Sequence, residues 1–359
     1  MVKKLRAGFI GCGGIATQKH MPSLATTGRA EMVAFCDIIE ERAVKAAKDF
    51  GTPDAKCYTD YKKMLEDKSL DMVYVCTPNK SHSFITIDAL EAGNHVMCEK
   101  PMAKTYEEAK AMVEAANRTG KLLTIGYQTR YQPDSQYIKQ SVERGDLGDI
   151  YFAKAHALRR RAVPTWGVFL NEEEQGGGPL IDIGTHALDL TLWYMNNYKV
   201  KSVMGNVYHK LNSNGVCGNA FGPWDPKEFT VEDSAFALIT MEDGATVVLE
   251  SSWALNLIDA FEARATLCGT KAGADMNDGV RINGDDFGRL YVSKPDLSAG
   301  GVAFFEGEGG NNNVTEQLVF VNAIEKGTPL TVLPEQALVV TQVLEAIYKS
   351  AETGKLVEF

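Results

Sequence analysis

Two short motifs in the chain combine side chains that could move a proton. Asp182 and His186 are four residues apart, and Lys100 lies between Glu99 and Pro101, directly after an apolar run. On a helix, a four-residue spacing puts both side chains on one face, one turn apart, where the carboxylate can orient the imidazole and stabilise its protonated form. The motifs therefore predict an acid–base pair and a catalytic lysine. An ion pair on a helix surface and a surface lysine are the structural alternatives.

A metal site is a further alternative for Asp182 and His186, because both residue types bind metals. A zinc site needs three or four protein ligands. No third or fourth ligand is recognisable by its spacing, so no metal is predicted.

The start of the chain carries a glycine-rich motif between an apolar run and a helical pattern. Residues 8–16 read Gly-Phe-Ile-Gly-Cys-Gly-Gly-Ile-Ala and contain G-x-G-x-x-A. Gly11 permits a tight turn, Gly13 lets a pyrophosphate approach the backbone, and Ala16 lets the helix pack closely on the strand, with the phosphates at the helix N-terminus. The motif predicts a dinucleotide site with contacts from Gly11, Gly13, Gly14, Ile15 and Ala16.

An acidic residue favours one nucleotide cofactor over the others. Asp37 follows the glycine motif at the end of the next apolar run, and Ile38 and Ile39 come after it. Its carboxylate can accept hydrogen bonds from both ribose hydroxyls and would repel a 2′-phosphate, and no Arg is present to bind one. NAD is therefore predicted rather than NADP, with FAD as a weaker alternative. A glycine-rich turn in which Asp37 caps the next helix is the alternative without a cofactor.

The first part of the chain alternates apolar runs with helical patterns. This alternation predicts an α/β Rossmann domain, with a doubly wound parallel sheet and helices on both faces. Ligands bind beyond the carboxyl ends of such strands, where Asn79, Glu99 and Lys100 are expected. The predicted strands are 5–10, 31–37, 72–77, 94–98 and 122–127, and the predicted helices are 15–26, 40–50, 81–92 and 106–119.

The second part of the chain has longer apolar runs, some with two-residue alternation. Glu242-Asp243-Gly244 is a hairpin signal between two of them. An α+β domain with an open, largely antiparallel sheet is predicted, and the domain limits are 1–127 and 128–359. Glycine-rich stretches predict loops at 212–222 and 299–312. The predicted strands are 150–157, 201–209, 233–241, 245–253 and 262–268, and the predicted helices are 135–144, 315–326 and 335–354.

The composition limits the classes of function. The 359 residues are 45% hydrophobic and 23% charged, as in a globular protein of about two domains. The net charge of −10 disfavours nucleic acid as a partner, since the only dense basic cluster is 159–161. No apolar run reaches the ~18–20 residues that span a bilayer, and glycines interrupt the apolar start before a signal peptide could form. Seven Cys without a C-x-x-C pair predict buried reduced thiols and a cytoplasmic location.

Taken together, the motifs resemble the Gfo/Idh/MocA family, the relatives of glucose–fructose oxidoreductase and inositol dehydrogenase. The resemblance covers essentially the whole chain through four ordered motifs: G-x-G-x-x-A, Thr77-Pro78-Asn79 with His82, Glu99-Lys100-Pro101, and G-G-x-L-x-D-x-G-x-H-x-x-D at 177–189. It implies a nucleotide-binding domain, an open sheet that mediates oligomerisation, and hydride transfer between a ring carbinol and nicotinamide. The implied cofactor contacts beyond the glycine motif are Thr77, Pro78, Asn79, His82, Glu99, Lys100 and Trp166.

The resemblance also implies roles for the acid–base residues. Lys100 would hydrogen-bond the reacting hydroxyl and help to remove its proton. His186 would be the principal acid–base group or share that role, and Asp182 would orient it or bind substrate. Burial and the nicotinium charge lower the pKa of a nearby lysine, so either Lys100 or His186 could act near neutral pH, and the identity of the base stays open.

The segment 159–169, which reads Arg-Arg-Arg-Ala-Val-Pro-Thr-Trp-Gly-Val-Phe, carries candidate substrate residues. Trp faces stack on the C–H faces of sugars, and Arg binds hydroxyls in bidentate fashion, which points to Trp166 and Arg161. Tyr127 and Arg130 are further candidates. A basic surface loop with a buried Trp is the alternative reading of the segment.

This segment resembles bacterial glycoside 3-dehydrogenases and C-glycoside 3-oxidases more than inositol dehydrogenases. Related enzymes place a Trp here near nicotinamide and sugar, and many follow it with an Arg, where this chain has Gly167. The resemblance implies an NAD-dependent oxidoreductase that oxidises the C3 hydroxyl of an O- or C-linked glucoside to a 3-oxo sugar.

Three alternatives remain beside this function. An inositol or free-sugar dehydrogenase keeps the chemistry and changes the substrate. An NAD-dependent glycosidase without net redox needs an additional base, which no spacing identifies. A non-catalytic NAD or sugar sensor need not keep Lys100, Asp182 and His186. The expected partners are a carbohydrate or glycoside and further copies of the chain, in a dimer, tetramer or higher oligomer, because an exposed sheet face has to be covered.

Overall fold

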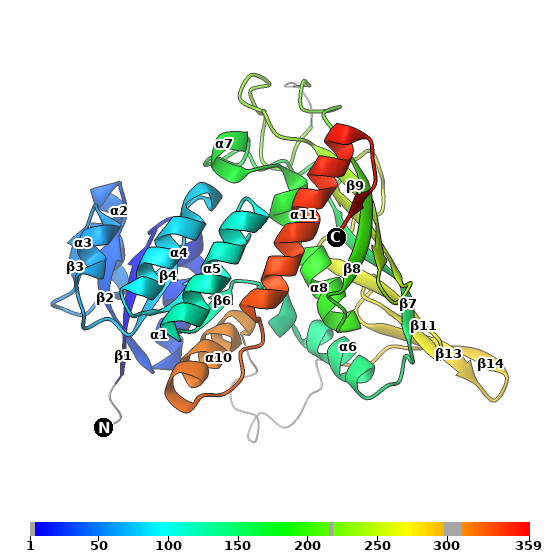
Figure 1. Cartoon of the computed structure of the whole chain (residues 1–359), viewed down its shortest axis with the longest axis horizontal. Coiled ribbons are helices and arrows are strands. Elements are labelled where there is room, and N and C mark those ends of the chain that lie inside the picture. The colour runs from blue at the N-terminus through cyan, green and yellow to red at the C-terminus, as the bar shows by residue number, and fades with distance from the viewer. Residues whose placement is uncertain (1–3, 215–217, 298–310) are drawn as a thin grey trace. The chain divides into compact units, whose positions relative to one another are not determined.

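The computed structural model describes residues 4–214, 218–297 and 311–359, which form two compact units (Figure 1). In the described residues, unit 1 comprises 4–131 and 311–338, and unit 2 comprises 132–297 and 339–359. The predicted loop 299–312 lies almost wholly outside the described residues, and the predicted loop 212–222 lies partly outside them. Among the described helices, none combines the length and the apolar character needed to cross a membrane.

The sheet of unit 1 confirms the predicted doubly wound arrangement. Its six described strands follow the order β3-β2-β1-β4-β5-β6, and all neighbours are parallel. The strand order reverses between β1 and β4, and ligands bind such sheets beyond the carboxyl ends at this switch point. The strands are β1 (Leu5–Ile10), β2 (Ala30–Cys36), β3 (Lys56–Tyr58), β4 (Met72–Val75), β5 (His95–Cys98) and β6 (Leu123–Ile125).

Helices cover both faces of this sheet because alternate strand residues point to opposite sides. On one side, Phe9 stacks on Tyr74 with ring centroids 4.5 Å apart, and residues of α1, α2 and α10 complete this core. On the other side, α4 and α5 lie side by side (Figure 1). The helices are α1 (Met21–Thr27), α2 (Glu40–Phe50), α3 (Tyr61–Leu65), α4 (His82–Glu91), α5 (Tyr106–Thr119) and α10 (Asn312–Lys326).

Helix α10 belongs to unit 1 although it comes late in the chain. Its Phe320 meets Tyr74 edge to face, with ring centroids 6.1 Å apart, and Phe320 and Val321 are almost completely buried in the core. The chain therefore returns to unit 1 to complete its core. The predicted division at residue 127 gave this segment to the second domain, and the limits 1–127 and 128–359 stay a prediction.

The sheet of unit 2 has nine described strands in the order β14-β13-β12-β11-β7-β10-β9-β8-β15. The neighbours β7 and β10 are parallel and the other neighbours are antiparallel, so the open, largely antiparallel sheet is confirmed. Gly244, at φ +90°, closes the predicted hairpin between β9 and β10. The strands are β7 (Ile150–Leu158), β8 (Val200–Tyr208), β9 (Ser234–Met241), β10 (Thr246–Ser252), β11 (Arg264–Gly269), β12 (Ala272–Asp275), β13 (Arg281–Asp286), β14 (Arg289–Ser293) and β15 (Val357–Glu358).

One face of this second sheet is buried. Ala155 of β7 and Leu249 of β10 are completely inaccessible to solvent, and α8 (Thr185–Met195) packs on this face. Ten of the eleven residues of α8 are buried, so the helix that carries His186 is held on a rigid support. The other helices of unit 2 are α6 (Pro133–Glu143), α7 (Glu172–Gln175) and most of α11 (Pro334–Thr353).

The opposite face of the second sheet is more exposed. Met204, Leu238, Val248 and Lys154 lie opposite one another across the adjacent strands β8, β9, β10 and β7. We call these four residues the open sheet row. Leu238 is 49% exposed and Met204 is 38% exposed, so apolar side chains on this face lie in contact with solvent.

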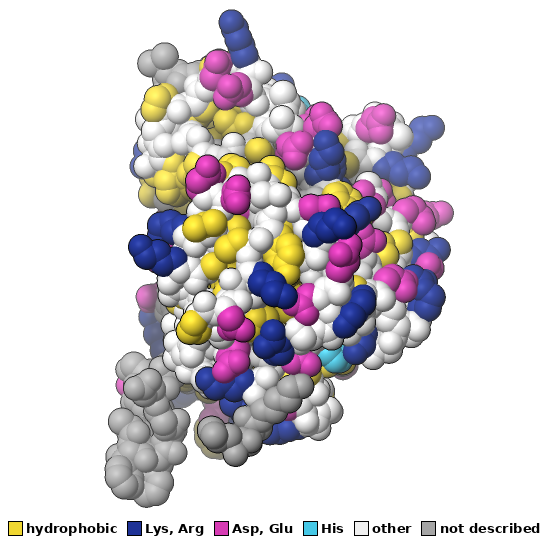
Figure 2. Space-filling model, turned by 90° about the vertical axis from the view of Figure 1, so that its left-hand side faces the viewer, with side chains coloured by type: hydrophobic (Ala, Val, Ile, Leu, Met, Phe, Trp, Pro, Cys, Tyr) yellow, Lys and Arg dark blue, Asp and Glu magenta, His cyan; other side chains and the backbone are white. Residues whose placement is uncertain are grey.

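Charges are mixed on the face of the molecule drawn in Figure 2. Lys and Arg side chains alternate there with Asp and Glu, and small hydrophobic patches lie between them. A surface of this kind attracts neither sign of charge strongly over a large area.

Candidate active site

The glycine-rich turn after β1 has the geometry that a dinucleotide requires. Gly11 has φ +90°, and a Cβ there would lie 2.4 Å from the carbonyl oxygen of Cys76, so only glycine fits the turn. A Cβ on Gly13 would meet nothing within 4 Å, so that stretch of backbone faces open space. The turn therefore fits a pyrophosphate that approaches the main chain.

Asp37 lies at the end of β2 and is fixed by main-chain donors. Its Oδ2 accepts a hydrogen bond from the Cys12 amide at 2.9 Å, and its Oδ1 accepts one from the Ile39 amide at 2.9 Å. A carboxylate oxygen has a second lone pair, so Asp37 can also accept from ribose hydroxyls. The carboxylate of Asp37 thus links the glycine-rich turn to the end of β2.

The helix that follows the glycine turn is π-helical over Ala16–His20, where an ordinary helix was expected. A π-helical turn shifts the side chains that follow it, and such turns often occur at functional sites. Here both Lys19 and His20 are buried, with 7% and 0% of their surface exposed. The wide turn therefore brings two consecutive polar side chains into the interior.

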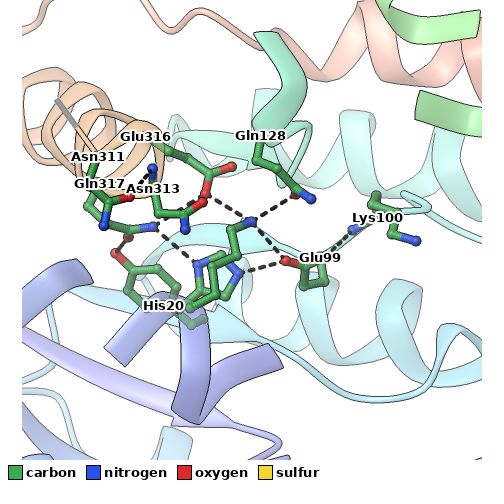
Figure 3. A network of polar contacts seen from close by, with 10 residues as sticks. His20, Glu99, Lys100, Gln128, Asn311, Asn313, Glu316 and Gln317 are labelled. Atoms are coloured by element: carbon green, nitrogen blue, oxygen red, sulfur yellow. Dashed lines mark hydrogen bonds and ion pairs between the residues drawn. The ribbon is translucent and has the colours of Figure 1, made fainter. Parts of the chain in front are cut away.

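Lys19 is the centre of a buried polar network (Figure 3). Its Nζ lies 3.3 Å from Oε1 of Glu99, 3.0 Å from Oε2 of Glu316 and 3.0 Å from Oε1 of Gln128. Three acceptors match the three N–H donors of an ammonium group. Although burial opposes the charge, Glu99 and Glu316 raise the pKa of Lys19, and an uncompensated charge would be costly at this depth.

His20 receives its orientation from a second chain of contacts (Figure 3). The hydroxyl of Tyr74 donates to Oε1 of Gln317 at 2.7 Å, which turns the amide nitrogen toward Nδ1 of His20 at 3.2 Å. The proton of the ring therefore lies on Nε2, which donates to Oε1 of Glu99 at 2.7 Å. A residue of α10 thus fixes the tautomer of a residue beside the nucleotide motif.

Glu99 transmits this network to Lys100. Its Oε2 accepts a hydrogen bond from the main-chain N–H of Lys100 at 3.0 Å, while Oε1 faces Lys19 and His20. Burial alone would raise the pKa of this carboxyl, but Lys19 and His20 hold it well below its usual range. Glu99 is therefore ionised, and it fixes the backbone that carries the predicted catalytic lysine.

His82 braces two loops at the switch-point edge of the sheet. Its Nδ1 lies 2.7 Å from the carbonyl oxygen of Pro101, and its Nε2 lies 2.8 Å from that of Thr77. Carbonyl oxygens only accept, so both nitrogens must donate. Burial lowers the pKa of His82, but Cys98 and the two carbonyls outweigh it and raise the value to about 9. Both ring nitrogens are thus occupied by main-chain carbonyls, and the cofactor contact expected of His82 stays a prediction.

Other predicted residues of unit 1 are buried. Tyr127 and Arg130 have no exposed surface, and Nη1 of Arg130 donates to the carbonyl oxygen of Thr331 at 2.8 Å and to Oε1 of Gln336 at 2.6 Å. Arg130 therefore anchors the segment after α10. Asn79 is also buried, at the start of the short helix before α4.

In unit 2, Asp182 and His186 lie on consecutive pieces of one helical segment. Asp182 belongs to a π-helical turn at Leu180–Gly184, and His186 lies in the first turn of α8. The indole N–H of Trp253 donates to Oδ2 of Asp182 at 3.0 Å, and Trp253 is fully buried. Asp182 is thus held from the sheet side by a rigid neutral donor, and its pairing with His186 stays a prediction.

Glu232 supports the turn that precedes Asp182. Its carboxylate accepts hydrogen bonds from the amide of Gly178 at 2.8 Å, the amide of Leu180 at 3.1 Å and the hydroxyl of Tyr348 at 2.9 Å. A Cβ on Gly178 would lie 2.2 Å from the carbonyl oxygen of Glu232, so glycine is required for this close approach. Burial raises the pKa of Glu232 to about 7, against the three donors that lower it.

The segment 159–169 has mixed surroundings. Trp166 is 53% exposed, and Arg161 is partly buried, with its Nη2 donating to Oδ1 of Asn256 at 2.9 Å. Arg159 pairs with Glu262 through two guanidinium nitrogens. Trp166 is therefore accessible as the substrate prediction requires, and the loop is not simply a basic surface.

Sequence patterns missed Lys19, His20, Glu232 and Trp253. Each supports a predicted residue across a long stretch of chain, because Lys19 and Glu99 are 80 positions apart and Trp253 and Asp182 are 71 apart. The one local signal was the position of Lys19 and His20 directly after the glycine motif.

Comparisons with known proteins match both parts of the chain. A family model described as the oxidoreductase family with an NAD-binding Rossmann fold, GFO/IDH/MocA, matches residues 5–127, and the GFO/IDH/MocA C-terminal domain matches residues 135–275. The D-glucoside 3-dehydrogenase of Escherichia coli K12 is 39% identical over 355 residues, 99% of this chain and 97% of that protein.

Two further relatives cover different shares of the chain. The inositol 2-dehydrogenase of Salmonella typhimurium LT2 is 31% identical over 202 residues, 55% of this chain and 57% of that protein. The crystal structure of aldose-aldose oxidoreductase from Caulobacter crescentus, complexed with glycerol, matches with a TM-score of 0.80 at 25% identity, covering 99% of this chain and 100% of that one.

The network around Lys19 predicts a strong energetic coupling. In a double-mutant cycle, we expect Lys19→Met and Glu316→Gln to show a coupling energy of about 1–3 kcal/mol, because each single variant leaves a buried charge with less compensation. The measurement is urea denaturation of the four proteins. The exposed pair Lys45–Asp49, 2.8 Å apart, is the matched control and should give about 0.3–0.5 kcal/mol. Equal couplings at the two sites would contradict a stabilising role of the network.

The raised pKa of Glu232 predicts a pH-dependent stability. Because the folded protein holds this proton more tightly than the unfolded chain, the contribution of Glu232 to stability falls as pH rises from 4.5 to about 7 and is constant above that. The melting temperature of the wild type, relative to Glu232→Gln, should therefore fall over this range in a thermal scan at several pH values. Glu352→Gln, at an exposed position of α11, is the control. A pH-independent difference for Glu232→Gln would refute the assignment.

Proposed function

Since the chain belongs to the Gfo/Idh/MocA oxidoreductase family and uses NAD, we propose that it oxidises the C3 hydroxyl of an O- or C-linked glucoside to a 3-oxo glycoside. The observation that carries this proposal is the likeness along nearly the whole chain to a D-glucoside 3-dehydrogenase. The proposed functional domains are 1–127 for the cofactor and 128–359 for substrate and oligomerisation.

The chemistry divides between the cofactor and the residues of this chain. The turn of Gly11 and Gly13 and the carboxylate of Asp37 would hold NAD, which would supply the hydride acceptor for the carbinol carbon. The hydroxyl proton must leave at the same time. In this proposal Lys100 hydrogen-bonds the reacting hydroxyl, and Lys100 and His186 share the removal of its proton.

Lys100 and His186 both lie next to rigidly held residues. Lys100 directly follows Glu99, whose carboxylate is held by Lys19 and His20. His186 lies in the buried helix α8, one turn after Asp182, which accepts a hydrogen bond from Trp253. Acid–base catalysis depends on such fixed geometry. Asp182 acts as orienter of His186 or as a ligand of the sugar, and Trp166 and Arg161 bind the glucoside.

An inositol or free-sugar dehydrogenase is the second candidate. It is favoured by the likeness to an inositol 2-dehydrogenase, which covers only 55% of this chain at 31% identity. The glucoside function has support over nearly the whole chain, including the second unit, where substrate selection is expected.

We also propose a homo-oligomer that forms through the open sheet row, and a cytoplasmic location. The exposed apolar residues of that row, Leu238 and Met204, support the first. The free thiols of the described residues support the second, because reduced cysteines suit a reducing compartment. These cysteines are Cys12, Cys36, Cys57, Cys76, Cys98 and Cys268.

A substrate panel tests the proposed reaction. Purified protein with NAD⁺ is offered methyl β-D-glucoside, glucose and myo-inositol, and products are read by mass spectrometry. We expect a product two mass units lighter from the glucoside, with the carbonyl at C3 by NMR. Turnover of inositol without turnover of the glucoside would contradict the proposal, and free sugar released without NADH would indicate the glycosidase.

The catalytic assignment has its own test. Lys100→Met and His186→Asn should each lower kcat by about 10²–10⁴-fold, the usual contribution of a positioned acid or base. For His186→Asn, NAD affinity measured by fluorescence titration should stay within about twofold, since His186 is not among the implied cofactor contacts; for Lys100→Met, kcat is compared at saturating NAD⁺, because Lys100 is also an implied cofactor contact. An unchanged kcat in one variant would show that its residue takes no part in the mechanism. An unchanged kcat in both variants would contradict the catalytic assignment of Lys100 and His186.

The oligomer proposal is tested on the open sheet row. Leu238→Glu places a charge on this face, and we expect it to lower the molar mass measured by light scattering. Val44→Glu is the matched control, because Val44 is also 49% exposed but lies on α2 of unit 1. A monomeric wild type, or an oligomer insensitive to Leu238→Glu, would contradict the proposal.

A further inference from the structure

Two aromatic side chains form an exposed surface in unit 2. Trp166 is 53% exposed and Phe221 is 45% exposed, and their rings meet edge to face with centroids 4.8 Å apart and planes at 88°. We call Trp166 and Phe221 the aromatic shelf. Large aromatic rings are usually buried, so two that touch each other and remain exposed mark a candidate contact surface.

The backbone under the aromatic shelf is fixed by hydrogen bonds between its two segments. The Ala220 amide donates to the carbonyl oxygen of Arg161 at 3.0 Å. Asn219 holds Val163 in both directions, with its Oδ1 accepting from the Val163 amide at 2.8 Å and its Nδ2 donating to the Val163 carbonyl oxygen at 3.0 Å. The hydroxyl of Thr165 donates to the Phe221 carbonyl oxygen at 2.6 Å. The shelf is therefore preorganised, which reduces the entropy cost of binding.

A continuous row of rings connects the aromatic shelf with Asp182. Trp166 contacts Phe169 with centroids 5.7 Å apart, and Phe169 contacts Trp253 with centroids 6.5 Å apart. Trp253 donates to Asp182 at 3.0 Å. The exposed rings thus lie at the outer end of a path whose inner end is the predicted acid–base segment.

The size of the shelf favours a small ligand over another protein. A Trp or Phe side chain offers about 150–250 Å², and only about half of each is exposed here. A stable protein interface needs roughly 800 Å² from each partner. Two half-exposed rings match one flat ring system of a ligand.

The guanidinium group of Arg161, on the segment that carries Trp166, also favours a small ligand at the aromatic shelf. Nη1 of Arg161 is buried and has no hydrogen-bond partner among the described residues, whereas its Nη2 donates to Asn256. Buried guanidinium donors normally have acceptors. An oxygen-rich ligand that reaches this position would supply one, and a sugar with an attached ring combines both kinds of group.

We propose that the aromatic shelf is the aglycone subsite, and that it selects glucosides whose aglycone is a flat aromatic ring, with the glucosyl ring on the side of Asp182. This inference rests on the proposed oxidation of glucosides. Edge-to-face and offset contacts with Trp166 and Phe221 would hold the aglycone without any change in the chemistry at C3, so the shelf should act on KM rather than on kcat.

A comparison of two substrates tests the aglycone subsite. For the wild type, kcat/KM for 4-nitrophenyl β-D-glucoside should exceed that for methyl β-D-glucoside by about 3- to 10-fold, as expected for one aromatic contact. Phe221→Ala should reduce this ratio toward one by raising KM for the aryl glucoside alone, and Phe221→Tyr should keep it. Phe84→Ala is the control, because Phe84 is 47% exposed on α4 of unit 1 and lies outside the proposed subsite.

The outcomes separate this inference from the function on which it rests. Equal use of both glucosides by the wild type, or a ratio unchanged in Phe221→Ala, overturns the aglycone subsite while the proposed function stands. A change of oligomeric state in Phe221→Ala with no change in the ratio also overturns it, in favour of a contact between copies.

If neither glucoside is oxidised, the proposed function fails and binding decides the subsite alone. Trp166 is the exposed tryptophan of the shelf, so 4-nitrophenyl β-D-glucoside should quench tryptophan fluorescence in the wild type and in Phe84→Ala but less in Phe221→Ala. Equal quenching in all three proteins, or none, overturns the subsite.

Discussion

The ionised carboxylate of Glu99 is the group on which the organisation of unit 1 depends. It is only 5% exposed, and a charge at that depth persists only when it is compensated and hydrogen-bonded. The compensation comes from Lys19 and His20, directly behind the nucleotide motif, and one further donor is the amide of Lys100. Because Glu99 joins the helical turn of Lys19 and His20 to the backbone of Lys100, movement of one of these segments without the other would break the contacts.

Unit 2 repeats this arrangement with a different carboxylate. Glu232 accepts from the amides of Gly178 and Leu180, just before Asp182, as Glu99 accepts from the amide of Lys100. In both units a buried carboxylate holds the main chain next to a predicted catalytic residue. Each unit also contains a π-helical turn beside its buried carboxylate. The turn Ala16–His20 carries the two partners of Glu99, and the turn Leu180–Gly184 contains Asp182. Such turns often occur at functional sites.

The sequence predicted what depends on local pattern and missed what depends on distant partners. The buried strands of unit 1 and helices such as α2 and α5 followed from apolar periodicity and helix ends. The strands β13 and β14 were not predicted, because their residues are mostly exposed and show no regular alternation of apolar and polar side chains. The family motif pointed to His82, and its position just after the last predicted strand of the first domain pointed to Arg130. Neither signal distinguishes a residue that binds a ligand from one that braces the main chain. The π-helical turns left no signal, because no residue type specifies them.

The two supporting carboxylates differ in the charge of their partners, and this difference determines how each responds to pH. Glu99 faces the ammonium of Lys19, and its pKa lies well below its usual range. Glu232 is held by two amides and a phenol, which are neutral donors, and burial raises its pKa to about 7. Over the neutral range the Lys100 loop therefore keeps an ionised anchor, whereas the anchor of the Asp182 turn gains a proton as pH falls. Because the folded protein holds the Glu232 proton more tightly than the unfolded chain does, this protonation adds to stability, whereas the charge of Glu99 and its hydrogen bond to the Lys100 amide do not change over the same range.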